Sequence, residues 1–139
     1  MSPELDEALC RDFPNVFKNR HLESCRSGIR WGFECGDGWE PIIREAAAAL
    51  EAEIAKYKAS SDFDPDLELG VADQVKEKFA TLRLYIGWGN EEMHRIIEEA
   101  ERKSETTCES CGAPGKIRGK GWIYNACDNC ENRRQANAK

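Results

Sequence analysis

Residues 108–111 read Cys-Glu-Ser-Cys and residues 127–130 read Cys-Asp-Asn-Cys, so two C-x2-C pairs stand near the C-terminal end with fifteen residues between them. This spacing is typical of a zinc site, because each pair can present two thiolates to one ion. Gly112 follows the first pair and supplies the permissive backbone needed where the chain turns away. We predict one zinc ion bound by Cys108, Cys111, Cys127 and Cys130.

A zinc ion held by four cysteines has no coordination position left for water or substrate, so its expected role is structural. Residues 108–139 are too few to bury a core of their own. Metal binding can supply on the order of 10 kcal/mol of folding free energy there. We therefore predict a zinc ribbon over residues 106–139 and a separate α+β body over residues 1–105.

Charge is unevenly distributed along the 139 residues, whose net charge is −6. Residues 1–107 contain 14 lysines and arginines against 23 aspartates and glutamates, whereas residues 108–139 contain 6 against 3. An acidic body repels phosphate backbones and attracts basic surfaces. The composition therefore disfavours nucleic-acid binding by the chain as a whole.

The sequence offers no signal for export or for membrane insertion. The first residues, Met-Ser-Pro-Glu-Leu-Asp, lack the basic and apolar stretches of a signal peptide. No segment approaches the roughly 20 apolar residues that span a bilayer. We expect a cytoplasmic protein without a membrane partner, whose seven cysteines are metal ligands or free thiols.

Apolar periodicity predicts two helices packed on a small antiparallel sheet. Apolar residues at three- and four-residue steps predict a helix over residues 39–59, opened by a capping box of Asp37 and Glu40. A second helix is expected from Asn90, its N-cap, to about Lys103. Its buried stripe is expected to consist of Met93, Ile96, Ile97 and Ala100.

Strand signals occur in two places. Ile29, Trp31, Phe33 and Cys35 alternate, which predicts a short half-buried strand. Residues 81–86 form a second strand, and residues 67–80 before it fit either a helix or a strand, of which we favour the strand. All four tryptophans adjoin a glycine, so we expect at least two of them to be buried.

Two basic groups are candidate contact sites. One lies in and after the hairpin predicted between the cysteine pairs, where charges on phosphates and rings under bases would bind single-stranded nucleic acid. It consists of Lys116, Arg118, Lys120, Trp122, Arg133 and Arg134. The favoured alternative is that Trp122 packs the ribbon against the body.

The second basic group could form a small pocket for an anionic or planar ligand such as a nucleotide. Its cations are Lys76, Lys78 and Arg83, and its rings are Tyr85 and Trp88. Ion pairs between these cations and the surrounding carboxylates are the favoured alternative.

Two further groups have a structural interpretation that we prefer. Cys10, Cys25, Cys35 and His21 lack any C-x2-C element, so buried free thiols are favoured over a second metal site. The glycine turn at residues 35–39 could cradle a phosphate, but Asp37 would repel an anion, which favours a capping turn. With two histidines and none of the common catalytic motifs, we do not expect an enzyme.

Three blocks together resemble a family of small proteins carried by bacteriophages and prophages. They are Trp-Gly-Phe-Glu-Cys-Gly-Asp-Gly-Trp at residues 31–39, Gln-Val-Lys-Glu-Lys-Phe-Ala-Thr-Leu-Arg-Leu-Tyr at residues 74–85, and the cysteine pairs with Gly121-Trp122 between them. Ala80 departs from the pattern, where glycine is expected. The resemblance implies a phage accessory protein acting in a bacterial host, and it carries no activity over to individual residues.

Composition and resemblance together favour a non-catalytic, anti-CRISPR-like protein that inhibits a host defence component through its acidic surface. The expected partner is a host protein or nucleoprotein complex. Two alternatives stay open: a zinc-ribbon transcriptional regulator that binds nucleic acid, and a sponge for a small nucleotide immune signal.

Overall fold

The computed structural model describes residues 1–23 and 27–138, which contain four α-helices, two short 3-10 helices and two small sheets. The α+β class is thus as predicted. The elements in chain order are α1 (Pro3–Asp12), η1 (Gly28–Trp31), β1 (Phe33–Glu34), η2 (Asp37–Trp39), α2 (Glu40–Lys58), β2 (Ala72–Lys78), β3 (Thr81–Ile86), α3 (Glu91–Ser104), β4 (Lys116–Arg118), β5 (Tyr124–Ala126) and α4 (Asp128–Asn137).

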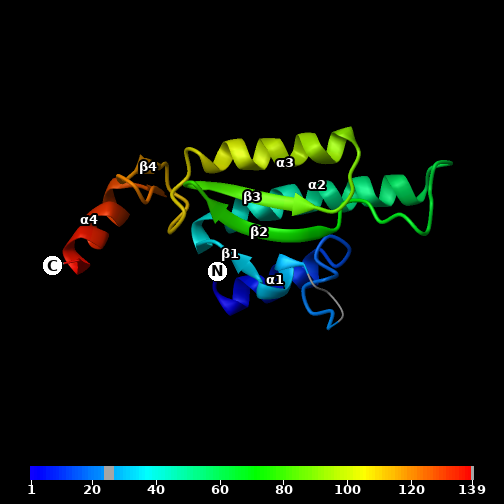
Figure 1. Ribbon diagram of the computed structural model, residues 1–139, viewed down its shortest axis with the longest axis horizontal. Helices are drawn as coiled ribbons and strands as arrows, with labels where there is room; N and C mark the ends of the chain where they lie inside the picture. The colour runs from blue at the N-terminus through cyan, green and yellow to red at the C-terminus, as the bar shows by residue number, and fades with distance from the viewer. Residues whose placement is uncertain (24–26, 139) are drawn as a thin grey trace.

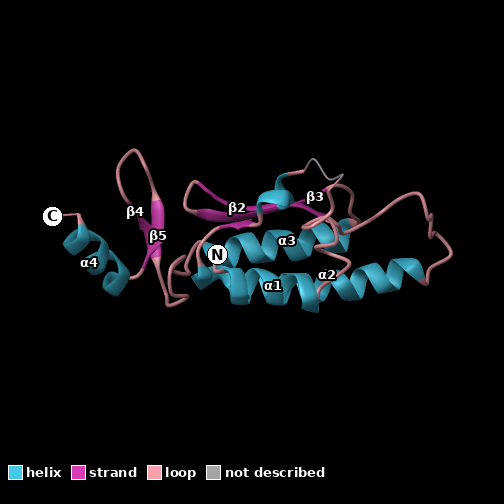
Figure 2. Cartoon of the chain, turned by 90° about the horizontal axis from the view of Figure 1, so that it is seen from below, coloured by secondary structure: helices cyan, strands magenta, loops and turns pink. Residues whose placement is uncertain are grey.

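Three helices cover one side of a three-stranded sheet ordered β1-β2-β3 (Figure 2). The two longer helices, α2 and α3, pack against each other, and α3 also contacts β3. The core lies between these layers and includes Trp39, Leu50, Leu84 and Met93, all almost fully buried. The predicted α3 stripe is buried as expected. The second sheet, β4-β5, lies at one end of the molecule with α4 (Figure 1).

Strands β2 and β3 form an antiparallel hairpin in which Val75 pairs with Leu84 and Lys76 pairs with Arg83. The strand preference for this region is confirmed from residue 72 onward. Phe79 and Ala80 connect the strands with φ angles of 53° and 66°. Two central residues at positive φ are the pattern of a type I′ turn, which favours glycine and asparagine. This turn explains why glycine is expected at position 80, where the backbone has a positive φ.

The outer edge of β3 is closed by side chains of α3. The backbone N–H of Leu82 donates to Ser104 Oγ at 2.8 Å, and Ser104 Oγ in turn donates to the carbonyl of Glu101. The backbone N–H of Leu84 interacts with the Glu101 carboxylate. Helix α3 therefore satisfies donors that an edge strand would otherwise leave open.

The sheet is mixed, so the prediction of a purely antiparallel sheet was wrong. Strand β1 pairs in parallel with β2, with Phe33 beside Val75 and Glu34 beside Lys76. The predicted strand over residues 29–35 was also wrong in its first half, which is η1. Gly32 at φ 84° redirects the chain between the two, because only glycine adopts this conformation readily.

The number of helices was underestimated, since α1 and α4 were not predicted. Helix α1 has conventional start signals: the Ser2 hydroxyl accepts from the Leu5 N–H, and Pro3 opens the first turn. Helix α4 begins at the second cysteine pair, where Cys127 is the N-cap. Both helices are short, at ten residues each, and α4 buries none of its residues.

Two local predictions failed for reasons of tertiary packing. The capping box is not formed, because the Asp37 carboxylate accepts from the Ser2 N–H and Glu40 pairs with Arg44. Of the four tryptophans only Trp39 is buried. The other three expose about seven tenths of their surface, namely Trp31 at 76%, Trp88 at 67% and Trp122 at 75%.

In the described residues, no helix is both long and apolar enough to cross a membrane.

The cap of α3 gives a stability prediction. The Asn90 side chain accepts from the Met93 N–H at 2.9 Å, so Asn90→Ala is expected to lower the free energy of unfolding by about 1 kcal/mol. Urea unfolding followed by circular dichroism measures it. Asn132→Ala removes an exposed asparagine inside α4 and serves as the control, with little expected change. Equal effects of the two changes would contradict the capping role.

Candidate metal centre

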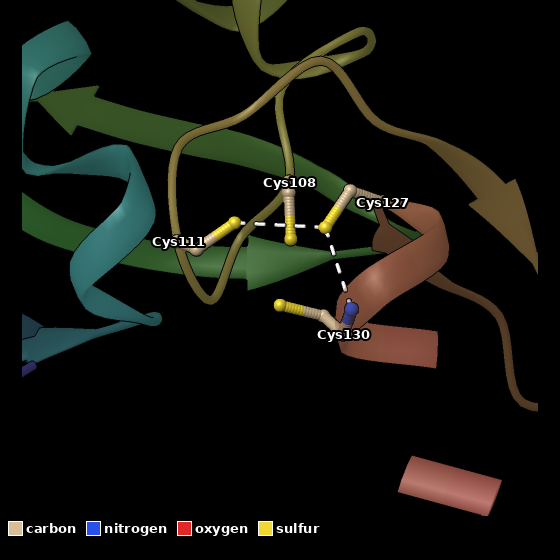
Figure 3. A group of neighbouring side chains, drawn as sticks. All are labelled: Cys108, Cys111, Cys127 and Cys130. Atoms are coloured by element: carbon tan, nitrogen blue, oxygen red, sulfur yellow. Dashed lines mark hydrogen bonds between the residues drawn. The ribbon is translucent and has the colours of Figure 1, made fainter. Parts of the chain in front are cut away.

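The four cysteines of the two C-x2-C pairs converge on one point, as Figure 3 shows. Their sulfur atoms all lie within 4.8 Å of one another, and Cys111 Sγ lies 3.6 Å from Cys127 Sγ. A tetrahedral zinc with Zn–S bonds of about 2.3 Å requires sulfur separations of about 3.8 Å. The donor set and its spacing are therefore compatible with a bound metal ion.

Two different structures hold the two pairs. Residues 108–112, called the knuckle from here on, turn back so that the Gly112 N–H donates to the Cys108 carbonyl at 2.9 Å. Cys127 and Cys130 belong to the start of α4, where Cys127 Sγ accepts from the Cys130 N–H at 3.4 Å. The β4–β5 hairpin joins the knuckle to α4, as predicted. A thiolate is favoured at a helix N-terminus.

The thiols of the cluster differ in the direction of their pKa shifts. Burial alone would raise the pKa of Cys108, but the backbone N–H groups of Cys127, Cys111 and Ser110 prevail and lower this pKa to about 6. Desolvation and the neighbouring thiols raise the pKa of Cys130 to about 12. Four thiolates so close together repel one another unless a cation lies between them, which is the electrostatic demand that a metal ion would meet.

Three arginines predicted as contact residues are engaged within the tail, which comprises residues 106–138. Arg133 Nη2 donates to Cys130 Sγ at 3.1 Å, next to the cysteine cluster. The Arg118 guanidinium donates to the Ala126 carbonyl and to the Asp128 carboxylate, at 2.8 and 2.6 Å. Arg134 stacks on the Tyr124 ring at 4.0 Å. Of the same predicted group, Lys116, Lys120 and Trp122 are exposed.

The glycine turn of the body receives the knuckle. The Gly38 N–H donates to the Glu109 carbonyl at 2.7 Å, and the Gly36 N–H donates to Glu109 Oε1 at 3.0 Å. Trp39 Nε1 donates to the Thr107 carbonyl at 2.9 Å. The donors considered for a phosphate are therefore occupied by Glu109. Burial raises the pKa of this carboxyl, and the Gly36 N–H opposes the shift.

Asn125 also connects the tail to the body, and the sequence did not reveal this role. It is 2% exposed, and its Nδ2 donates to the carbonyls of Ser104 and Glu105 at 3.2 and 2.7 Å. It thereby satisfies carbonyls at the C-terminal end of α3, which helices leave open. Position 125 resembles any polar residue of a hairpin in the sequence, so no local signal could have identified it.

The predicted pocket of Lys76, Lys78 and Arg83 is only partly assembled. Lys76 lies directly opposite Arg83 and Lys78 lies opposite Thr81, so the cations share the face of the sheet that points away from α2 and α3. Trp88 follows the other end of β3, beyond the Ala72–Ile86 pair. The structure therefore brings the three cations together without Trp88.

The other two described cysteines, Cys10 and Cys35, do not join a group of four donors. Burial raises the pKa of the Cys10 and Cys35 thiols to about 12. Asp6, Cys10 and His21 approach one another within 4.8 Å, but the Arg20 guanidinium binds the Asp6 carboxylate at 3.1 Å and supplies the positive charge there. Cys35 is outside this group. Cys25 lies outside the described residues.

No protein-family model matches the chain, and no curated protein or solved structure is significantly similar to it. The resemblance to phage proteins thus stays a prediction.

The contact between turn and knuckle can be tested at Gly38. A Cβ atom at this position would lie 2.3 Å from the Cys108 carbonyl oxygen and 2.5 Å from the Gly112 nitrogen. Gly38→Ala is therefore expected to push the knuckle away and to lower the free energy of unfolding by about 1–3 kcal/mol. Urea unfolding of the metal-loaded protein measures this.

The matched control is Gly87→Ala, whose new Cβ would meet nothing closer than an Asp73 side-chain oxygen at 3.3 Å. It should be tolerated far better. A Gly38→Ala protein as stable as the control would show that the turn and the knuckle are not in close contact.

Proposed function

We propose that this chain is a non-catalytic binding protein in which one structural zinc ion holds the tail, residues 106–138, against the body. The observation that carries the proposal is the convergence of four sulfur atoms within 4.8 Å at the junction. Four thiolates this close together favour zinc among the common metals and would leave no open position for a reaction. Zinc would therefore act on function only by fixing the shape of a binding surface.

Metal analysis and chelation test the zinc assignment. We expect one zinc per chain by mass spectrometry of native protein. Chelation should increase amide hydrogen exchange in β4, β5 and α4 and leave α2 and α3 protected, because the tail depends on the metal. Cys127→Ser should lose the zinc, and Cys10→Ser, remote from the cluster, should keep it. Iron in place of zinc, or a tail unaffected by chelation, would refute the assignment.

Helix α3 presents the acidic surface that we propose for partner binding. Glu91, Glu98 and the C-cap residue Glu105, called the acidic row, are exposed and spaced by seven residues. Such positions return to nearly the same side of a helix. No cation pairs with them in the described part of the chain. The cations of the same helix are already engaged, in the pairs Arg95–Glu92, Arg102–Glu99 and Lys103–Glu45.

The proposed partner is a basic, nucleic-acid-binding surface of a host protein. The support is charge complementarity: a body with an excess of carboxylates and an unneutralised acidic row can compete with nucleic acid for such a surface. Together with the resemblance to phage proteins, this favours an anti-CRISPR-like inhibitor of a host defence component in the bacterial cytoplasm.

A transcriptional regulator that binds nucleic acid through the ribbon alone draws less support. Arg118, Arg133 and Arg134 are three of its five predicted cations, and each is engaged within the tail. Cations spent on internal contacts contribute less to binding phosphates than free ones do.

Charge reversal of the acidic row tests the partner proposal. The variant Glu91→Lys, Glu98→Lys, Glu105→Lys is expected to lose the basic host proteins that zinc-loaded wild-type protein captures from bacterial lysate, as measured by quantitative mass spectrometry. The control variant Glu4→Lys, Glu7→Lys, Asp62→Lys makes the same change in net charge at exposed positions elsewhere. It should retain most of the capture. Equal capture by all three proteins would refute a role for the row.

A further inference from the structure

A cleft separates the β2–β3 turn of the body from the β4–β5 loop of the tail. It has a volume of about 260 Å³ and is lined by Lys76, Glu77, Lys78 and Phe79 on one side and by Gly121, Trp122 and Ile123 on the other. We call it the turn cleft. It combines residues from the two basic groups that the sequence predicted separately, and Phe79, which belonged to neither.

Two large aromatic side chains border the turn cleft and are open to solvent. Phe79 is 68% exposed and Trp122 is 75% exposed. Phe79 also holds a φ of 53°, a conformation that is a genuine outlier for a bulky residue and costs free energy. A turn built for stability alone would place glycine or asparagine here. Both the strain and the exposure of Phe79 point to a ligand that its ring contacts.

The lysines of the turn cleft have no carboxylate partner. Lys76 and Lys78 form no ion pair within the described residues, unlike the cations of α3, and the Lys78 ammonium lies 5.6 Å from the centroid of the Phe79 ring. Arg83, opposite Lys76, donates to Thr81 Oγ1 and to the Leu82 carbonyl. Like charges directly opposite in a sheet are destabilising, so this pairing also favours an anionic ligand.

The carboxylates near these cations have other partners. The Glu77 carboxylate accepts from the Ala80 N–H at 2.7 Å, and the Glu34 carboxylate accepts from Gln74 Nε2 at 3.2 Å. Neither carboxylate forms an ion pair with Lys76 or Lys78, although Glu77 keeps its negative charge inside the cleft.

We propose that the turn cleft binds single-stranded nucleic acid, with Phe79 and Trp122 stacking on bases and Lys76 and Lys78 contacting phosphates. Exposed rings beside cations that have no carboxylate partner are the combination that recognises a single strand, whose bases offer their faces. A duplex hides those faces, and an acidic peptide would engage the lysines without needing the rings. The cleft is smaller than the roughly 300–1,000 Å³ of pockets that enclose small ligands, which fits one part of a longer chain better.

The proposal is independent of the acidic row, which lies on α3. It does depend on the folded tail, because Trp122 stands between the two cysteine pairs. An acidic row facing a protein and a turn cleft holding a strand would together suit a nucleoprotein complex as the partner.

Fluorescence anisotropy of the zinc-loaded full chain tests the proposal, with labelled oligo-dT and oligo-U strands and a duplex of equal length as probes. We expect the single strands to bind more tightly than the duplex. Trp122→Ala and Phe79→Gly should each weaken binding by about 5- to 150-fold, the range for losing one stacked base. Lys76→Gln and Lys78→Gln should each reduce the slope of log affinity against log salt by about 0.7.

Matched controls separate the loss of a contact from the loss of the fold. Phe79→Gly relieves the positive φ, so its urea midpoint should be unchanged or higher while its affinity falls. Trp88→Ala removes a tryptophan of similar exposure, 67% against 75%, at the opposite end of β3 and should bind like the wild type. Lys116→Gln removes an exposed cation that does not line the cleft and should leave the salt slope nearly unchanged.

Several results would overturn the proposal. These are the absence of a complex at low salt, equal weakening by Trp88→Ala and Trp122→Ala, and binding of the duplex or of polyglutamate that the ring variants leave unaffected. Charge reversal of the acidic row should not weaken strand binding, so a failure of the partner proposal and a failure of this one are distinguishable.

Discussion

The close contact between the Gly36–Gly38 backbone and the knuckle couples the two parts of the molecule. Side chains are excluded at this point, since a Cβ on Gly36 or Gly38 would overlap backbone atoms of the knuckle. The hydrogen bonds to Glu109 and the bond from Trp39 to Thr107 then hold the glycine turn and the knuckle together. The position of the β4–β5 hairpin, and with it the turn cleft, depends on this contact and on the ion that we propose to shape the knuckle.

The elements that sequence reasoning identified correctly are those with a local cause. Regular apolar steps and the Asn90 cap marked α2 and α3, a strand-rich run marked β2 and β3, and ligand spacing marked the cysteine cluster. The failures have distant causes. Gly32 redirects the chain before β1, and Ser2 captures the Asp37 carboxylate from across the fold. A tryptophan next to glycine was not sufficient for burial, because only Trp39 faces the core.

The candidate sites likewise depend on contacts that the sequence does not display. A sequence displays each cation but not its partner. Ion pairs were favoured for Lys76 and Lys78, yet neither lysine forms one within the described residues, whereas Arg118, Arg133 and Arg134 make contacts within the tail. The grouping of Lys76 with Trp88 failed because an antiparallel hairpin places the two ends of β3 far apart. Phe79 did not stand out in the sequence as a site residue, because its positive φ is a property of the turn and not of the residue type.

The closed edge of β3 limits how this protein can associate with other chains. Exposed strand edges commonly recruit an extended peptide or a second copy through main-chain pairing. Here Ser104 already accepts the amide of Leu82, and the Glu101 carboxylate interacts with that of Leu84. Recognition on that flank must therefore read helix side chains rather than backbone, which makes the identity of each residue on α3 matter more than the shape of its main chain.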